Sequence, residues 1–486
     1  MTQYLMSIPL LAGGAESLAA RIAKLFAYLA AVGCVLALNG CATYSTSFST
    51  IEQQLAGRKY GDALNTIEKG AKDKRDRVLY LLNKGMVQRM NGDYVASNQS
   101  LEAAKQEMER LYAASISENA LSFVINDATV SYAGDDYEQV LVHLYMALNY
   151  LELGQRDEAR VEALQVDTKL REIAEKFPES KFTEDALSRY LSGMIYEELG
   201  ERSDAMIAYR KAYEAYKKYQ ANFSVPIPPM LKLDLLRLAQ QQGLKDELAQ
   251  YQKEFGMAPQ RVDAGTAQAD GELVFILNDG LAPIKREEVI ATWAPPPAVA
   301  AEAAKSPRKV HTATPTPPVL VNIALPYYES RPERVVSARI SVAGKQADTQ
   351  MMEDIDAIAR ASLRARMPAI TARAVARAVA KAAIQESVDK AGQKGNANQK
   401  NGDAGARLVA SLLVRAASLA TERADTRSWL TLPANVQMAR LPLQAGRYDV
   451  TVELLGRDAQ VLETRVFPQV SIRKDRKTYL TQHSVP

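Results

Sequence analysis

Hydrophobic positions divide the chain into a helical first half and a second half in which strands and helices alternate. Between 48 and 256 they recur at helical spacing. Beyond Gly256 that spacing is lost, and apolar runs at 272–277, 319–325 and 335–342 indicate β-strands. The chain is therefore expected to hold two architecturally different parts.

Helical spacing returns at 351–390 and again at 407–423, with a break rich in Gly, Asn and Lys between them. Pro368 is expected to kink or break the first of these helices. Together the two helices predict a hairpin that covers a sheet. Five further runs predict strands that close the chain: 429–432, 435–443, 447–455, 460–466 and 470–480.

An internal repeat is superimposed on the helical pattern of the first half. Four positions recur with an offset of 34 residues: Tyr60, Ala63, Ile67 and Gly70, then Tyr94, Ser97, Leu101 and Ala104. This interval is the period of tetratricopeptide repeats, each a pair of antiparallel helices that cannot bury its apolar face alone. The fullest copy resembles that family's pattern at six positions: Gly193, Tyr196, Gly200, Ala205, Tyr209 and Ala212. The alternative is a generic helical bundle whose small residues align by chance.

These patterns predict an α+β multidomain fold, in which an N-terminal tetratricopeptide-like α-solenoid precedes a mixed β-sheet or sandwich domain with a helical hairpin. The predicted segments run in this order: a signal peptide at 1–40, a tether at 41–47, the solenoid at 48–256, strands at 257–350 with a Pro-rich connector at 293–318, the hairpin at 351–425 with its break at 391–406, and closing strands at 426–486.

The first forty residues have the organisation of a targeting segment. Arg21 and Lys24 precede an uncharged apolar run at 25–38, which has the length of a signal-peptide core and is short for a membrane span. The run ends in Leu38-Asn39-Gly40-Cys41, which resembles a bacterial lipobox with Cys41 as the lipidated residue. Two or three acyl chains would anchor the protein firmly, and Ala42 resembles a signal for the periplasmic face of the outer membrane. A plain secretory peptide or an uncleaved anchor is the alternative.

Charge and composition exclude several functional classes. Lys and Arg number 60 against 57 Asp and Glu, a net charge of +3, which lacks the basic excess of a nucleic-acid-binding protein. Two cysteines cannot build a disulfide framework or a structural zinc site. The three histidines, His143, His311 and His483, lie in separate segments, and the sequence has no nucleotide-binding, hydrolase or metalloprotease motif. We therefore expect no catalytic residue, no metal site and no cofactor.

The repeat pattern identifies candidate partner-binding residues. In a solenoid of this kind the concave face is lined mainly by the first helix of each pair. On that pattern Arg89, Glu152, Tyr190, Glu197 and Glu198 face the groove, so we expect them to bind a partner protein. An aromatic side chain such as Tyr190 is a typical anchor. The alternative for the two glutamates is a solvated helix end.

Two further groups of residues allow both a functional and a structural interpretation. Arg373, Arg377 and Lys381 lie one turn apart on a predicted helix, where they either contact anionic envelope groups or form a solvated face. Four polar or aromatic residues cluster where a helix gives way to a strand: Glu422, Asp425, Arg427 and Trp429. This cluster is either a ligand or glycan contact or an ion-paired helix end with Trp429 anchoring the sheet.

Several segments form a set with a consistent order. They are Tyr137-Glu138 with Ala147-Leu148-Asn149-Tyr150-Leu151, Asn278-Asp279-Gly280-Leu281-Ala282-Pro283, Ala324-Leu325-Pro326-Tyr327-Tyr328, and 424–433. The set resembles an uncharacterised family of Gram-negative tetratricopeptide lipoproteins, and the stretch at 441–450 resembles small PEGA β-modules. The resemblance implies a lipid-anchored solenoid protein and carries no established activity.

Two functions from different classes follow from these observations. The first is an outer-membrane-anchored periplasmic scaffold or adaptor whose repeat groove binds an envelope protein. The second is a cell-wall factor that binds or modifies glycan, with peptidoglycan as its ligand. The scarcity of histidine and the lack of any catalytic spacing favour the first.

Overall fold

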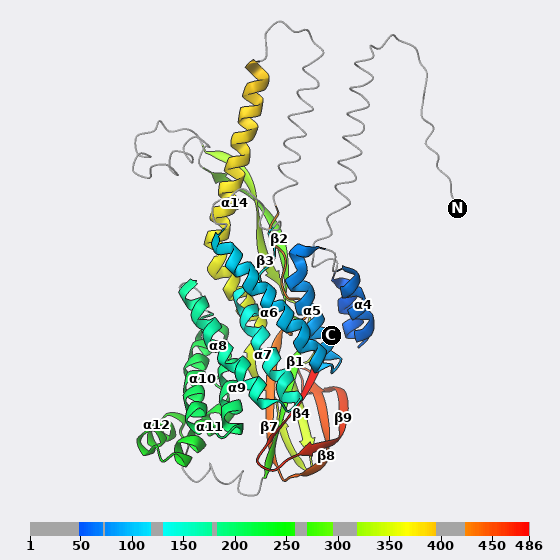
Figure 1. The fold of residues 1–486 in the computed structure, drawn as a ribbon, viewed down its shortest axis with the longest axis vertical. Helices are drawn as coiled ribbons and strands as arrows, with labels where there is room; N and C mark the ends of the chain where they lie inside the picture. The colour runs from blue at the N-terminus through cyan, green and yellow to red at the C-terminus, as the bar shows by residue number, and fades with distance from the viewer. Residues whose placement is uncertain are drawn as a thin grey trace, which may run out of the picture.

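A computed structural model describes residues 48–70, 73–117, 130–176, 182–257, 270–294, 318–394 and 423–485. This part of the chain forms a helical array, two four-stranded sheets and an arm that projects away from both (Figure 1). The predicted α+β class is confirmed. The predicted signal peptide, tether and Pro-rich connector and the second helix of the hairpin up to Glu422 lie outside the described residues.

The helical array consists of helices that pair in chain order, and we call it the solenoid. Its elements are α3 (Ser49–Ala56), α4 (Tyr60–Gly70), the 3-10 turn η1 (Lys74–Asp76), α5 (Arg77–Met90), α6 (Tyr94–Ser117), α7 (Asp136–Glu152), α8 (Arg156–Lys176), α9 (Ala186–Glu198), α10 (Arg202–Phe223), α11 (Pro229–Gln241) and α12 (Lys245–Phe255). Each odd-numbered helix packs against the next even-numbered one. Four of the turns within pairs contain a glycine with φ between 69° and 81°: Gly92, Gly154, Gly200 and Gly243.

The 34-residue offset corresponds to structurally equivalent positions. Tyr60 and Tyr94 begin the second helices α4 and α6, and the small residues Ala63 and Ser97 that follow are fully buried. A small residue at such a crossing lets two helix backbones approach closely. The same effect is strongest at Gly193, where an added β-carbon would lie 2.3 Å from Tyr209 Cδ1. The predicted repeat therefore follows from close helix crossings.

Two sheets form a sandwich beside the solenoid. Sheet A has the order β10-β1-β7-β6, and sheet C has the order β5-β4-β8-β9. The strands are β1 (Gly271–Asp279), β4 (Ser337–Val342), β5 (Lys345–Asp348), β6 (Gln350–Asp354), β7 (Asn435–Leu443), β8 (Gly446–Leu455), β9 (Val461–Ile472) and β10 (Lys477–Ser484). Strand β1 pairs parallel with β10 and antiparallel with β7, so segments about 200 residues apart lie side by side.

Strand β1 is buried on both faces. Its odd-numbered residues, including Phe275, pack against sheet C in one hydrophobic cluster. Its even-numbered residues Val274 and Ile276 belong to the cluster that also fills the solenoid. Sheet A is therefore the middle of three layers, which explains why β1 has a continuous apolar run instead of an alternating one. The predicted boundary near Gly256 separates two chain segments that share one core.

The arm consists of a two-stranded ribbon and a long helix. Strands β2 (Ile284–Ala294) and β3 (Val319–Glu329) pair antiparallel, and α14 (Ile355–Lys394) covers one face of them. Ala294, Val321 and Ile323 are buried against alanines and a valine of α14. In Figure 1 the arm extends beyond α5 and α6, at the end opposite sheet C.

Two local predictions are wrong, and a third is wrong in part. Residues 351–354 form part of β6, so the helix begins at Ile355. Helix α14 continues through Pro368, so the proline does not break it. Residues 429–432 form a turn rather than a strand, because Trp429 is held by side-chain and backbone contacts with the solenoid. Strand β2 was not foreseen, since its first half carries Lys285, Arg286 and two glutamates.

The crossing at Gly193 provides a test of the repeat packing. Gly193→Leu should lower the free energy of unfolding by about 2 kcal/mol or more, because the side chain overpacks the contact with Tyr209. Chemical denaturation followed by circular dichroism measures the change. Gly61→Ala is the matched control, since a β-carbon there meets no atom within 4 Å, and its effect should be neutral or slightly stabilising. Equal stability of Gly193→Leu and the wild type would contradict the packing described here.

Candidate functional site

The five residues predicted to line the groove lie on the first helices of three pairs. Arg89 is on α5, Glu152 on α7, and Tyr190, Glu197 and Glu198 on α9. We call the surface of α5, α7, α9 and α11 that contacts sheet A the inner face. Each of the five residues contacts sheet A or a group bonded to it, so the expected groove is filled by strands of the same chain.

Strand β10 runs along the inner face as a bound segment. Arg89 donates a hydrogen bond to Thr481 Oγ1 at 3.2 Å, and Glu152 accepts from the side chain and the backbone of Thr481. At the other end of β10, Lys477 Nζ lies 3.5 Å from Glu197 Oε2. Glu198 accepts a hydrogen bond from the Lys477 backbone. The solenoid thus holds its own strand much as repeat proteins hold a partner peptide.

Tyr190 belongs to a buried ionic network between α9, α11 and sheet A. Its hydroxyl donates to Asp234 at 2.7 Å and accepts from Arg440 of β7 at 2.6 Å. Arg440 also donates two hydrogen bonds of 2.8 Å to Glu272 of β1. Burial alone would raise the pKa of Asp234, but Arg440 and Arg237 hold that pKa well below its ordinary value. The carboxylate is therefore ionised and paired.

These contacts revise the prediction of an open groove. Tyr190 has no exposed surface, and Glu197 is paired with Arg237 and Lys477. The alternative of a solvated helix end also fails for Glu197 and Glu198, which are mostly buried. A second protein could reach this surface only by displacing β10 and β7. One feature of the sequence indicates this contact: Arg440 is a lone charged residue within the otherwise uncharged strand β7.

The segments that carried the family resemblance converge on the start of α7. Tyr137 and Tyr328 bring their hydroxyls within 3.2 Å of each other. Glu138 accepts a hydrogen bond from the Trp429 backbone at 2.7 Å, and Tyr145 donates to Asn278 at 3.1 Å. These segments therefore join the solenoid, sheet A, the ribbon and the turn at 429–432.

Asp135 is the charged centre of this junction. It accepts from Lys285 of β2 at 2.8 Å and from Tyr328 of β3 at 3.1 Å, and it pairs with Arg366 of α14. Burial would raise its pKa, but Arg366 and Lys285 hold the pKa far below the ordinary range. For the neighbouring Glu138, burial and the Asp135 charge raise the pKa to about 7. The arm is thus fixed at its root to the solenoid.

The cluster around Trp429 has the structural role. Trp429 is buried, and its indole donates to Thr431 at 3.0 Å. Arg427 pairs with Asp425 at 2.8 Å and with Asp76 at 3.2 Å. Glu422 lies outside the described residues. Every described member of the cluster therefore contributes to the packing of the turn.

The predicted basic row on α14 is not a uniformly solvated face. Arg377 is buried, with only 5% of its surface exposed, whereas Arg373 is exposed. Lys381 is partly buried, and both it and Arg377 have interaction partners. A continuous cationic stripe is therefore not available along this helix.

Two buried carboxyl groups meet where α9 touches β6. Asp185 caps α9 and accepts from the Ser188 backbone at 2.6 Å, while Glu353 of β6 lies near the Tyr219 hydroxyl at 3.5 Å. Both side chains are fully buried and are joined by a hydrogen bond. Burial and the Asp185 charge raise the pKa of Glu353 well above its ordinary value. Glu353 is therefore protonated and donates to Asp185, whose own pKa is also raised by burial.

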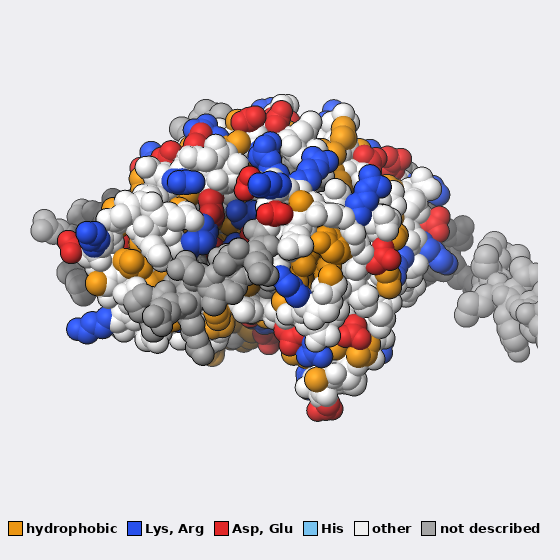
Figure 2. Space-filling model, turned by 90° about the horizontal axis from the view of Figure 1, so that it is seen from below, with side chains coloured by type: hydrophobic (Ala, Val, Ile, Leu, Met, Phe, Trp, Pro, Cys, Tyr) orange, Lys and Arg blue, Asp and Glu red, His pale blue; other side chains and the backbone are white. Residues whose placement is uncertain are grey.

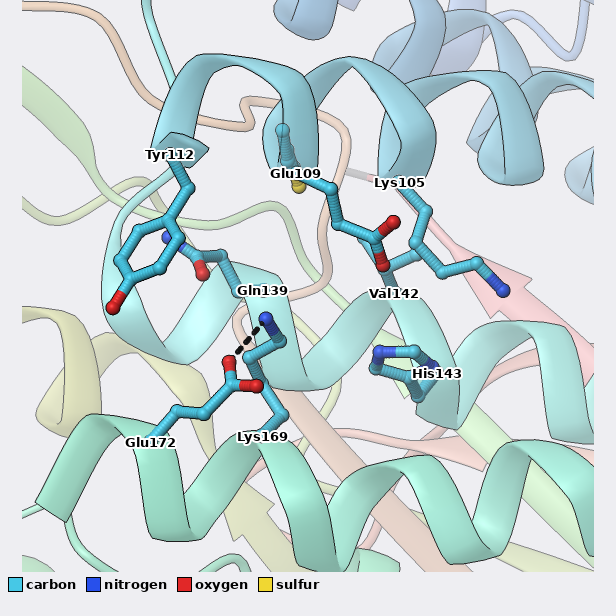
Figure 3. A pocket seen from close by; sticks show the side chains of 9 residues that line it. Lys105, Glu109, Tyr112, Gln139, Val142, His143, Lys169 and Glu172 are labelled. Atoms are coloured by element: carbon cyan, nitrogen blue, oxygen red, sulfur yellow. Dashed lines mark hydrogen bonds and ion pairs between the residues drawn. The ribbon is translucent and has the colours of Figure 1, made fainter. Parts of the chain in front are cut away.

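A cavity of about 150 Å³ opens between α6, α7 and α8 (Figure 3). Lys105, His143 and Lys169 line it, together with Gln139 and Tyr112. Lys105, His143 and Lys169 each have a partner within the protein. Lys105 pairs with Glu102 at 2.6 Å, Lys169 with Glu172 at 2.7 Å, and His143 Nδ1 lies 2.7 Å from Glu162. The lining combines apolar and polar side chains and carries charges of both signs, so it does not present a single charge to a ligand.

Metal binding and membrane crossing can be examined directly in the described part of the chain. There, His, Cys, Asp and Glu side chains do not gather in groups of three that could hold a metal ion. No helix in these ranges is both long and apolar enough to cross a bilayer.

Comparisons with known proteins find distant likenesses among solved structures. No protein-family model matches the chain, and no curated protein sequence matches it. Among solved structures, MamA is 14% identical, with a TM-score of 0.27, and the match covers 44% of this chain and 92% of MamA. Apo RapI is 12% identical, with a TM-score of 0.32, over 48% of this chain and 58% of its own. A kinesin light chain from Podosopora anserina with TPR-like repeats is 13% identical, with a TM-score of 0.28, over 45% of this chain and 94% of its own.

The carboxyl pair predicts a pH dependence of stability. Because Glu353 keeps its proton in the folded state, its contribution is fully present at low pH. Stability then falls by about 1.4 kcal/mol per pH unit above the ordinary glutamate pKa, until the folded-state pKa is reached. Glu353→Gln keeps a donor to Asp185 and cannot ionise. It should match the wild type near pH 4 and be more stable than the wild type at pH 8.

Urea unfolding at a series of pH values measures this difference. Glu288→Gln, on the exposed part of β2, should keep the wild-type pH profile. If Glu353→Gln were less stable than the wild type at pH 8, the shared proton would be the wrong description of this pair.

Proposed function

We propose that this protein is a non-catalytic scaffold for protein partners, anchored through Cys41 to the periplasmic face of the outer membrane. The lipobox-like sequence that ends at Cys41 supports the anchor. The helical-repeat architecture and the mixed charges of the solenoid cavity support a binding role over a catalytic one. The solenoid acts as a cradle for sheet A, so partners bind on outer surfaces of the molecule.

The observation that carries this proposal is the edge of sheet C. In the described part of the chain, β9 pairs with β8 and with no other strand. Val461 and Val466 expose about half of their surface there, and Leu462 exposes 37%. An exposed apolar edge strand is a template for a partner strand, since backbone groups supply affinity and side chains supply specificity.

The open stretch of β9 has a defined end. The register with β8 shifts between Tyr448 and Val450, opposite Pro468 and Gln469, and Gln469 has a φ of 54°. A bulge with a proline blocks further pairing at an edge. A second register shift, between Leu454 and Leu455, leaves Leu462 without a paired residue near the start of the strand. Regular pairing by a partner is thereby confined to about 463–466, with the exposed Val461 beside it.

Charge does not select the partner at this end of the molecule. Figure 2 shows Lys, Arg, Asp and Glu side chains intermixed on the face that includes the end opposite the arm, with small hydrophobic groups between them. Beside the edge, Glu463 is already paired with Arg58. The partner segment is therefore expected to be apolar and extended rather than strongly charged.

Substitution at the edge tests the scaffold role. Val461→Asp combined with Val466→Asp should reduce recovery of cross-linked envelope partners by about tenfold or more, because two apolar contacts are lost. Val161→Asp on α8, which is exposed to the same degree, should leave recovery unchanged. Equal recovery from both variants, at unchanged helicity, would place the partner surface elsewhere.

Substitution of the lipidated residue tests the anchor. Cys41→Ser removes the thiol to which acyl chains attach, so the protein should lose fatty-acid labelling and its firm hold on the outer membrane. Metabolic labelling and membrane fractionation measure the two effects. Cys34→Ser is the matched control, because Cys34 lies within the apolar run and precedes the expected cleavage point. Labelling that persists in Cys41→Ser would refute the lipid anchor.

A further inference from the structure

Toward its far end, the ribbon of the arm exposes an apolar row on the face opposite the residues that α14 buries. Nearer the root, Lys285 and Tyr328 of the same face are buried. Trp293 exposes 67% of its surface, Val289 61% and Leu320 57%. Trp293 and Leu320 are directly opposite each other in the register, so they share a face, and Val289 lies on the same face by alternation. The other face, with Val321 and Ile323, is buried under α14.

The described chain begins beside the root of this ribbon. Arg331, two residues beyond β3, places its guanidinium 5.8 Å from the Phe48 ring. Cys41 precedes Phe48 by seven positions, which span at most about 25 Å. The ribbon rises about 30 Å from Ile284 to Trp293, at roughly 3.3 Å per residue. The tether is therefore long enough for the acyl chains on Cys41 and the apolar row to meet the same bilayer.

We propose that the outer face of the ribbon lies on the phospholipid bilayer that holds the acyl chains of Cys41. This inference rests on the anchor in the proposed function and adds a second contact with the same membrane. Tryptophan suits the site because its ring is apolar while its N–H can face the headgroups. Valine and leucine beside it add apolar area at the acyl boundary.

The contact fixes the orientation of the molecule as well as its position. An acyl anchor on a tether leaves a protein free to rotate, whereas a second contact through the folded body does not. The junction at Asp135 fixes the arm to the solenoid, so the orientation of the arm is passed to the whole body. Sheet C, at the opposite end in Figure 1, is then held away from the bilayer with its β9 edge accessible.

Tryptophan fluorescence tests the inference directly, because the chain has two tryptophans and Trp429 is buried. The lipidated full-length protein is reconstituted into vesicles of phosphatidylethanolamine and phosphatidylglycerol, with or without brominated acyl chains. Brominated lipid should quench the Trp293 emission and spare that of Trp429. In Trp293→Phe, the remaining emission should be the same in both kinds of vesicle.

Two other outcomes would count against the proposal. If the protein stays on the vesicles after a high-salt wash and its wild-type emission is not quenched, the ribbon does not touch lipid, although the anchor stands. A protein partner that covers the ribbon in the cell would give this same unquenched result with purified protein. If the protein does not stay on the vesicles, both the anchor and the bilayer contact are refuted.

Discussion

The burial of β1 on both faces is the constraint on which the rest of the structure depends. One face meets sheet C through residues such as Phe275, and the other meets the solenoid through Val274 and Ile276. Because β1 also pairs with β10 and β7, it fixes the position of the C-terminal strands beside the inner face. Removing any one of the three layers would expose apolar surface on β1, so each layer stabilises the other two.

Buried charges give this packing its specificity. Arg440 with Asp234 and Lys285 with Asp135 join segments that lie 150 residues or more apart. A buried pair adds little net stability over a hydrophobic pair, but a missing partner costs about 3–5 kcal/mol. If the sheet packed on the solenoid in another position or orientation, such charges would be left unpaired. The inner face is therefore shaped for one occupant, the sheet of its own chain.

The sequence predicts the helices and strands better than it predicts which segment fills the inner face of the solenoid. The helix pairs can be predicted from small residues at helix crossings, such as Ala63 and Ser97. Strands β1, β7 and β8 can be predicted from their apolar positions, because the pattern of buried residues lies within each segment. The strand at 350–354 escaped prediction, since it is short and leads straight into α14. The groove residues were placed on the correct helices. Their partners could not be foreseen, because the contact between Tyr190 and Arg440 depends on chain segments 250 residues apart.

The parallel pairing of β1 with β10 also dictates the order in which the fold can be completed. The solenoid and β1 are synthesised about 200 residues before Lys477–Ser484, the segment that covers much of the inner face. Non-local parallel pairing is intrinsically slow, since loop closure must precede the contacts that reward it. The nascent chain thus passes through a stage in which an assembled helical array has an uncovered apolar and charged surface. Such a stage is open to chaperones and to misassembly with a second chain, and closure of the last strand ends it.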